Sequence, residues 1–404
     1  MRAYERLIRY AKVHTTSSDH TGTHPSTARQ FDLAHLLVEE MKQLGIADAH
    51  VDEHCYVYGA LPATPGCEDK PALGLIAHID TAPSASGENV QPQVVEYTGG
   101  DIPLPAGGKV LSPKQFPVMD TLVGHTLVTT DGTTLLGGDD KAGIADILTA
   151  IEHIQTEQLP HGKLCIGFTP DEEVGEGADL FDVEGFGADF AYTVDGGAAG
   201  EIEYQNFNAA TAKLEITGFS VHPGSAKNLL VNALTVATQL HGLLPASEAP
   251  EHTEGTEGFY MLEEISGTPA KAHMEYILRD HDAAKFAARK ETMQRAADFI
   301  NARYGEGTVQ LTITDSYYNM EEKILPHFHL VENARTATLA AGVQPVTVPV
   351  RGGTDGARLS FMGLPCPNLG TGDFNCHGEC EFVSAQQMDQ VVQILLNIIE
   401  LYFK

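Results

Sequence analysis

The sequence predicts an α/β core that is interrupted by a smaller inserted domain. Continuous apolar runs of strand length alternate with a helical pattern in residues 1–207, which is typical of a buried sheet covered by helices. After Phe207 the pattern changes to strands in which apolar and polar residues alternate. The chain has 404 residues, more than one hydrophobic core usually supports. We therefore expect two domains.

The elements of the core follow from apolar patterning. Residues 26–45 are predicted as a helix, with Ser26 as its cap, because Phe31 and Leu37 belong to one broad apolar face. Continuous apolar runs indicate strands buried on both faces. The predicted strands are 71–78, 163–169 and 190–194, and the predicted helix between the first two is 142–155. In a core of this kind, ligand-binding residues follow the carboxyl ends of the strands.

The segment after Phe207 has the element order of a ferredoxin-like domain, β-α-β-β-α-β. Alternation predicts a strand at 211–217, and further strands are predicted at 258–265, 272–279 and 308–314. Helical patterns occupy 228–244 and 282–304. Because candidate metal ligands lie on both sides of this segment, we expect it to be an insertion. The predicted domains are a discontinuous core of residues 1–207 and 316–404 and an inserted domain of residues 208–315.

Composition limits the partners and the location of the protein. The chain has 25 basic and 55 acidic residues, which give a formal net charge of −30, and a field of that sign repels nucleic acids and anionic membrane surfaces. No apolar run approaches the roughly 18–20 residues of a membrane span. Residues 1–6 do not lead into the apolar core of a signal peptide. Six irregularly spaced cysteines do not form a disulfide framework, so we expect a cytoplasmic protein.

Five potential metal ligands lie in short polar motifs at the ends of predicted strands or the starts of loops. They are His78, Asp139, Glu173, Asp195 and His377. Two imidazoles and three carboxylates suit two divalent cations that share one carboxylate, each cation also taking one histidine and one terminal carboxylate. Each motif alone also has an ordinary interpretation: a polar strand end with a satisfied histidine for His78, a loop with helix-capping aspartates for Asp139, and polar turns or loops for the others. Together they predict a two-metal hydrolase.

Further acids accompany these ligands. Asp80 lies two residues after His78 on an extended backbone, so both side chains point to one side, and a carboxylate there can orient an imidazole ligand. We interpret Glu172 and Glu173 as a divided pair, one binding metal and the other moving a proton; a solvated acidic turn is the alternative. A thiolate zinc site is a further alternative, although paired C-x-x-C spacing is absent, and it would use Cys366, Cys376, His377 and Cys380.

Several motifs carry a family resemblance. They are HID at 78–80, LLGGDDKAGIA at 135–145, TPDEEVGEGA at 169–178, YTVDGG at 192–197, SVHPGSAKNLLVNA at 220–233, EGFY at 257–260, DSYYNM at 315–320, RGGTDGARLSFMGLPCPN at 351–368 and EFVS at 381–384. Over about residues 25–385 the chain resembles the peptidase T family. These are tripeptide aminopeptidases among the dizinc exopeptidases related to aminoacylase and carboxypeptidase G.

The resemblance implies a zinc-exopeptidase-like catalytic core with an inserted lid or dimerisation domain, through which two chains form a homodimer. It also implies two zinc ions per chain, with a cis peptide between Asp139 and Asp140. One ion would be held by His78 and Asp195 and the other by Glu173 and His377, with Asp139 bridging the two. Cys376 and Cys380 depart from the residue types expected beside the last ligand, which bears on metal preference and sensitivity to oxidation.

The same resemblance implies roles for residues that do not bind metal. Glu172 would be the general base, and Asp80 would orient a ligand. His222 would reach a catalytic site from the inserted domain and stabilise the tetrahedral intermediate. Arg279 and Asn232 are implied as contacts of the C-terminal end of the peptide, and Arg351 is a further candidate, because a guanidinium grips a carboxylate well. An ordinary ion pair is the alternative for each arginine.

The expected function is therefore an aminopeptidase that hydrolyses the N-terminal peptide bond of tripeptides through a hydroxide bridging two metals. One alternative is a related dizinc amidohydrolase or dipeptidase that acts on N-acyl amino acids or dipeptides. Another is a non-catalytic binding protein of the same fold. The intact set of five ligands and Glu172 argue against the second alternative.

Overall fold

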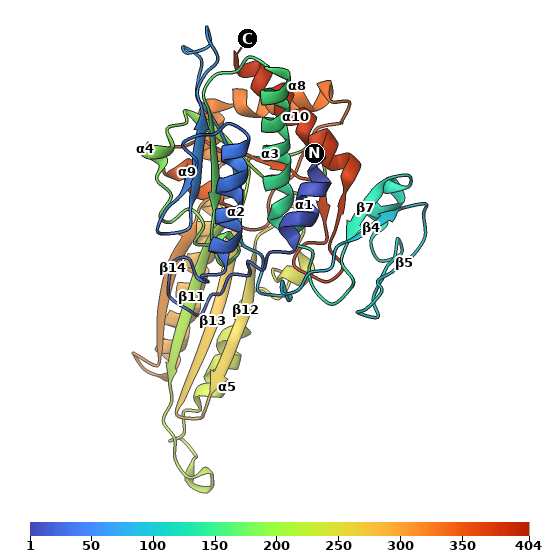
Figure 1. The fold of residues 1–404 in the computed structure, drawn as a ribbon. Helices are drawn as coiled ribbons and strands as arrows, with labels where there is room; N and C mark the ends of the chain where they lie inside the picture. The colour runs from blue at the N-terminus through green and yellow to red at the C-terminus, as the bar shows by residue number, and fades with distance from the viewer. Residues whose placement is uncertain (404) are drawn as a thin grey trace. The chain divides into compact units, whose positions relative to one another are not determined.

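The computed structural model describes residues 1–403, which form two compact units. The core unit contains Met1–Tyr204, Glu322–Val348 and the chain from Thr354 onward. The inserted unit contains Gln205–Glu321 and, in addition, the short segment Pro349–Gly353, which lies within the range predicted for the core. The mixed α/β fold class is confirmed (Figure 1).

An eight-stranded sheet forms the centre of the core unit. Its order is β1 (His50–Val51), β2 (Val57–Leu61), β8 (Leu164–Thr169), β3 (Leu73–His78), β9 (Phe190–Gly196), β16 (Asn368–Gly370), β10 (Glu201–Glu203) and β15 (Val346–Thr347). β3 is parallel to both β8 and β9. Every residue of β3 and β8 is buried, as the continuous apolar runs predict.

Helices cover this sheet. α3 (Gly138–Glu157) packs against β3 and β9, and α1 (Ala3–Ala11) and α10 (Ala385–Phe403) pack against α3 (Figure 1). α8 (His329–Ala340) packs against α10, and α2 (Gln30–Gln43) packs against β1 and β2. A separate apolar cluster places Phe186 of α4 (Val183–Phe186) and Leu359 of α9 (Asp355–Phe361) with Ile76 of β3. A short helix, α7 (Glu321–Ile324), precedes α8.

A smaller antiparallel sheet lies beside the main one in the core unit. Its order is β17 (Asp373–Phe374), β18 (Phe382–Ser384), β7 (Thr126–Thr129) and β4 (Gln93–Glu96). β5 (Ile102–Pro103) and β6 (Val110–Leu111) form a hairpin, and its Ile102 and Leu111 belong to one apolar cluster with Leu127 of β7 and Phe382 of β18. This sheet brings the C-terminal part of the chain next to residues that precede α3.

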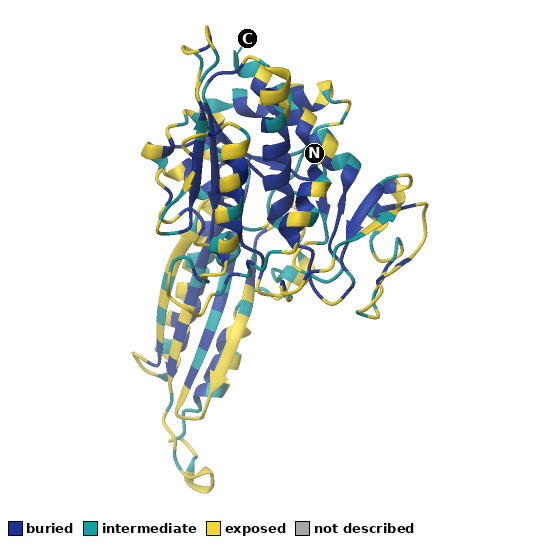
Figure 2. Cartoon of the chain, in the orientation of Figure 1, coloured by how far each residue is buried: buried dark blue, intermediate teal, exposed yellow. Residues whose placement is uncertain are grey.

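The inserted unit has the predicted β-α-β-β-α-β order. Its elements are β11 (Asn208–Thr217), α5 (Ala233–His241), β12 (Phe259–Gly267), β13 (Lys271–Asp280), α6 (Ala283–Tyr304) and β14 (Val309–Tyr317). The strands form an antiparallel sheet in the order β12-β13-β11-β14. Figure 2 shows buried and more exposed residues alternating along the two central strands, β11 and β13. The apolar side chains of the two helices and of one sheet face form a single cluster, so the other face meets solvent.

Two details of the predicted helices are wrong. Ser26 does not cap α2, which begins at Gln30 after a turn, because the Ser26 hydroxyl instead donates to Asp171 at 2.5 Å. α5 is shorter than residues 228–244, and Asn232 precedes it as the N-cap: the Asn232 Oδ1 atom accepts from the backbone N–H of Leu234 at 3.0 Å. Within residues 1–403, no helix has the length and apolar character that a membrane crossing requires.

Candidate metal centre

Three parallel strands deliver polar residues to one edge of the core sheet. β3 ends at His78, which is paired in register with Thr169, the last residue of β8. The short helix η2 (Glu172–Val174) follows β8 closely, and Asp195 lies near the end of β9. Because parallel strands end at the same edge, these side chains meet there.

Asp139 lies between two histidines. Its Oδ1 atom is 2.8 Å from His78 Nε2, and its Oδ2 atom is 3.0 Å from His377 Nε2. His377 Nε2 is also 2.9 Å from Glu173 Oε2, and His78 Nε2 is 3.6 Å from Asp195 Oδ1. The Asp139–Asp140 peptide is cis. The five predicted ligands, which are spread from residue 78 to residue 377, therefore converge in the core unit.

Asp80 connects the histidine to the acidic pair. The His78 Nδ1 atom lies 3.1 Å from the Asp80 backbone oxygen and 3.4 Å from its Oδ1 atom. The Asp80 carboxylate also accepts the backbone N–H groups of Glu172 at 3.0 Å and of Glu173 at 3.2 Å. Asp80 is fully buried. Asp80 therefore contacts the imidazole mainly through its backbone oxygen, while its carboxylate holds the backbone of Glu172 and Glu173.

Asp171 is a buried acid whose role the sequence analysis missed. It has a left-handed backbone with φ of 58° and directly precedes Glu172. Its carboxylate accepts from the Ser26 backbone N–H at 2.7 Å, the Ser26 hydroxyl at 2.5 Å and the Gln30 side-chain amide at 2.6 Å. Ser26 lies 145 residues earlier in the chain, so no local pattern could have indicated this anchor.

The electrostatics of the site reflect crowded carboxylates. Burial, together with the nearby charge of Asp195, raises the pKa of Glu172 well above its usual range. Burial likewise raises the pKa of Asp195. Hydrogen bonds to Asp139 and Glu173 raise the pKa of His377 to about 11. The protein therefore favours positive charge among these acids.

The donor set fits divalent cations. Glu173 has a side chain that is 4% exposed, and its Oε1 atom is buried without a hydrogen-bond partner among residues 1–403. A buried carboxylate oxygen without a partner is costly unless a cation or a donor meets it. Ligand atoms of His78, Asp139 and Glu173 lie within 4.8 Å of one another, as do those of His78, Asp140 and Asp195. Nitrogen and oxygen ligands of this kind suit zinc.

The alternative thiolate site does not form in the described chain. Cys366 is fully buried in an apolar cluster with Ile76 and Leu359. Cys376 is the cysteine whose sulfur lies near the centre, within 4.8 Å of ligand atoms of Asp139 and His377.

The other predicted site residues belong to the inserted unit. His222 is exposed, and its Nδ1 atom accepts from the Gly224 backbone N–H at 3.1 Å. Arg279 donates to the backbone oxygens of Leu278 at 2.9 Å and Ala210 at 3.3 Å, and its guanidinium lies over the Tyr317 ring. These contacts are all internal to the inserted unit.

Arg351 lies near the same end of the inserted sheet as Arg279. It donates to the backbone oxygens of Gly255 and Glu257 at 2.8 and 3.0 Å and to the Thr253 hydroxyl at 2.9 Å. Its guanidinium also lies 5.7 Å from the ring of Phe259, the residue paired in register with Arg279. Neither arginine forms a salt bridge with a carboxylate in residues 1–403.

His222 and Asn232 lie at the other end of that sheet. The loop that carries His222 is closed by the pairing of Phe219 with Val231. Ala233, which follows Asn232, donates its N–H to the Pro269 oxygen at 3.0 Å, just before β13 begins. Arg279 is eight residues beyond Lys271 on β13, which is about 27 Å of strand at about 3.4 Å per residue.

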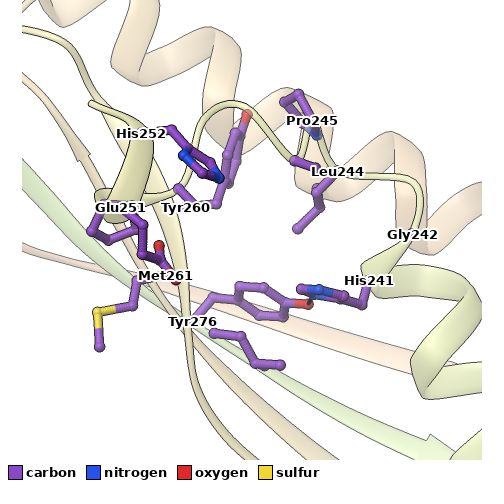
Figure 3. A pocket seen from close by; sticks show the side chains of 13 residues that line it. His241, Gly242, Leu244, Pro245, Glu251, His252, Tyr260, Met261 and Tyr276 are labelled. Carbon is purple, nitrogen blue, oxygen red and sulfur yellow. Dashed lines mark hydrogen bonds between the residues drawn. The ribbon is translucent and has the colours of Figure 1, made fainter.

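The inserted unit also contains a cavity of ≈ 640 Å³ between α5 and β12. In Figure 3 the side chains of His241 and Tyr276 point toward each other, and the His241 Nδ1 atom lies 3.0 Å from the Tyr276 hydroxyl. None of the predicted site residues lines this cavity.

Comparison with known proteins places this geometry among peptidases. The chain is 52% identical over 404 residues to peptidase T of Alkaliphilus oremlandii, with 99% of each chain covered. It is 53% identical over 402 residues to peptidase T of Clostridium novyi and 52% identical over 402 residues to that of Vibrio parahaemolyticus, covering 99% of this chain and 98% of each relative. A family model of a peptidase dimerisation domain matches residues 204–308, and one of M42 glutamyl aminopeptidase matches residues 122–222.

Solved structures share the fold. An aminopeptidase PepT from Bacillus cereus superposes with a TM-score of 0.80 at 22% identity, covering 100% of this chain and 98% of the other. A tripeptidase from Staphylococcus aureus gives 0.79 at 22% identity with the same coverage. A dinuclear metal-binding peptidase of the M20 family from Bacillus subtilis gives 0.65 at 15% identity, covering 99% and 98% of the two chains.

Proposed function

The chain belongs to the peptidase T family, and from this premise we propose that it removes the N-terminal residue from tripeptides with the help of two zinc ions. Membership of that family makes the chain a peptidase. The observation that supports the proposed mechanism best is the position of Asp139, whose two oxygens face His78 on one side and His377 on the other.

We assign the five ligands as two sets that share Asp139. His78 and Asp195 would complete one set, and Glu173 and His377 the other. When bound, two such cations lower the pKa of a water molecule and polarise the scissile carbonyl, which supplies the nucleophile and the electrophile of peptide hydrolysis. The chain contributes the spacing: the contacts of 2.8 and 3.0 Å across Asp139 hold the two histidines on opposite sides of one carboxylate.

Glu172 is the proposed general base. It belongs to neither ligand set, and its backbone is fixed through Asp80, next to Glu173. Its pKa is raised by burial and by Asp195, so this carboxyl group can hold a proton that a weaker base would release. Glu172 would accept the proton of the attacking water and pass it to the leaving amine. His222 would stabilise the developing oxyanion as a donor.

The tripeptide's C-terminal carboxylate needs a cationic partner. Arg279 and Arg351 are suited to this role because neither is neutralised by a carboxylate, and both lie near Phe259 at one end of the inserted sheet. A guanidinium can grip a carboxylate with two parallel bonds. A carboxylate held at a fixed distance from the cleaved bond would let the enzyme select peptides by length.

One chain cannot supply all of these contacts to one substrate. About 27 Å of strand separates the Asn232 end of the inserted sheet from Arg279, whereas an extended tripeptide spans roughly 10 Å. If both sets of residues contact the substrate, they come from two copies of the chain. We therefore propose a homodimer in which each catalytic site receives one of these sets from the partner subunit.

The inserted unit offers an edge for such a dimer. β12 is an edge strand, and Met261 and Ile265 on it are 39% and 44% exposed. An unpaired strand edge with exposed apolar residues is a ready site for pairing with a second copy. The match of residues 204–308 to a peptidase dimerisation domain supports this assignment.

We further propose that the protein is cytoplasmic, that its substrates are small peptides, and that it binds neither nucleic acids nor membranes. All six cysteines are free thiols in the structure, which suits a reducing compartment. The net charge of −30 disfavours binding to polyanions.

The function can be tested with purified enzyme and a panel of substrates. Di-, tri- and tetrapeptides should be compared with N-acyl amino acids, and the metal content should be measured on the same preparation. We expect tripeptides to be cleaved best, two zinc ions per chain and reversible loss of activity with a chelator. Preference for N-acyl amino acids or dipeptides would favour a related amidohydrolase or dipeptidase, and no turnover of any substrate would favour a binding protein.

A further inference from the structure

We propose that Glu381 is a positioning residue for the metal centre, which fixes Asp139 relative to His377. The inference rests on the proposed function, because it concerns the ligand set assigned there. Glu381 is 1% exposed, and its carboxylate meets the loop that leads into α3.

Three backbone groups of that loop converge on the one carboxylate. Leu136 and Gly137 donate their N–H groups to Oε2 at 2.6 and 2.9 Å, and Asp139 donates its own N–H to Oε1 at 3.1 Å. Hydrogen bonds to a charged acceptor are among the stronger ones in proteins. Because backbone donors occupy both of its oxygens, Glu381 is suited to holding the loop that carries Asp139 and not to binding a metal ion itself.

The same short hairpin carries His377. β17 ends at Phe374 and β18 begins at Phe382, so His377 and Glu381 both lie in the connection between these two strands. β18 is paired with β7, which ties the hairpin into the smaller sheet. Glu381 therefore joins the backbone of the Asp139 loop to the segment from which His377 reaches Asp139 Oδ2 at 3.0 Å.

Close packing supports this coupling. A Cβ atom on Gly138 would come within 2.6 Å of Asp373 Oδ1 and 2.7 Å of Val383 Cγ2. The loop before Asp139 thus lies directly against β17 and β18, the two strands of the hairpin. Glycine at position 138 permits this close approach, and Glu381 fixes the position of the loop relative to the hairpin. A shift of either segment would separate Asp139 from His377, the two residues assigned to one cation.

An amide cannot replace this carboxylate. Glutamine offers one oxygen and one NH₂ group, and the NH₂ group would face at least one backbone N–H donor. We expect Glu381→Gln to weaken binding of the second cation about 10–100-fold, the usual effect of losing a group that orients ligands. The first cation, assigned to His78 and Asp195, should be affected less.

The test is a Zn²⁺ titration of metal-free enzyme, followed by calorimetry, with circular dichroism as a check of folding. Glu379→Gln is the matched control, because Glu379 belongs to the same hairpin but pairs with Lys109 at 2.7 Å near the surface. Wild type and Glu379→Gln should bind two ions alike, and Glu381→Gln should show the weakened second step. Wild-type affinity for both ions in Glu381→Gln would overturn the positioning role.

Two further outcomes are decisive. A wild-type enzyme that fails to bind two ions would contradict the proposed function and not the role of Glu381 alone. If Glu381→Gln does not fold, Glu381→Asp, which keeps the charge on a shorter side chain, should fold and show the weakened second step. Unfolding of both variants would make Glu381 a residue of general stability and would reject the proposal.

Discussion

Asn232 and Arg279 lie at opposite ends of the sheet in the inserted unit. Asn232 is next to the turn that precedes β13, and Arg279 is the penultimate residue of that strand. Both are proposed to contact the substrate, and a tripeptide is too short to join them within one chain. Which chain of the proposed dimer supplies each residue to a given site is therefore open to experiment.

Mixing inactive variants answers it. Glu172→Gln chains should be combined with His222→Ala chains in one experiment and with Arg279→Ala chains in another. If a residue acts on the partner's site, half of the heterodimer sites are intact, and about a quarter of wild-type activity should return. We expect this recovery in one of the two mixtures, because in the proposed dimer one residue acts in its own chain and the other in the partner's.

Unmixed variants, and mixtures prepared without exchange of subunits, are the controls for that experiment. Recovery in both mixtures, or in neither, would contradict the division of the site between two copies. Sedimentation of each variant would establish that the substitutions leave the dimer intact.

Substitutions of Glu172 and of Glu173 should have different effects on metal content. Glu172→Gln should lower kcat by about 10²–10⁴-fold, the contribution typical of a general base, while two zinc ions remain bound. Glu173→Ala should lose one metal as well as activity, because Glu173 Oε2 faces His377 at 2.9 Å. Elemental analysis of both variants checks the assignment, and the reverse pattern would exchange the two roles.

The sequence predicts where the candidate ligands lie because their motifs follow strand ends, and parallel strands end at the same edge of a sheet. The apolar runs of β3 and β9 predict that His78 and Asp195 lie at strand ends, whereas the metal site itself is predicted only from the five motifs together. The order of elements in the inserted unit also follows, because strand and helix patterns succeed one another along the sequence in the order that the structure has.

Contacts between distant segments could not be predicted in this way. Asp171 is anchored by Ser26 and Gln30 across more than a hundred residues. Serine is a residue type that often caps helices, but Ser26 binds the Asp171 carboxylate instead. The distance between Asn232 and Arg279 likewise depends on the register in which the strands pair. The hydrophobic pattern of a strand specifies that register only once its pairing partner is known.

We expect the buried carboxyl group of Glu203 to make the stability of the metal-free protein depend on pH. It is 8% exposed on β10, where Asn368 donates its side-chain N–H to Oε2 at 3.2 Å. Burial, followed by the charge of Glu201, raises its pKa to about 8, compared with the ordinary value of 4.5. The charges of Asp195 and Asp139 add to this pKa shift. The folded state therefore binds this proton more tightly than the unfolded state, so its contribution is full below about pH 4.5 and is lost as the pH rises toward 8.

Glu203→Gln removes that titration while keeping an oxygen for Asn368. In chelator, the Tm of Glu203→Gln minus that of wild type should increase from pH 5 to pH 9. Glu306→Gln is the control, because Glu306 is exposed in the turn before β14. A Tm difference that is constant with pH would show that Glu203 does not hold its proton in the folded state.

The last prediction concerns the partner of the substrate's carboxylate. Arg279→Ala should lower kcat/KM for tripeptides. The expected decrease corresponds to a loss of about 2–4 kcal/mol of transition-state stabilisation, as is usual when one partner of a desolvated charge pair is removed. Amidating the tripeptide's C-terminus should impose a similar penalty on the wild-type enzyme, because it removes the other partner of the pair. It should impose little further penalty on Arg279→Ala, whose contact is already lost. Arg351→Ala provides the comparison: its guanidinium is committed to the oxygens of Gly255, Glu257 and Thr253, so part of its effect should persist with the amidated substrate as lost local structure. If the penalties of Arg279→Ala and amidation simply add, Arg279 is not the group that binds the carboxylate.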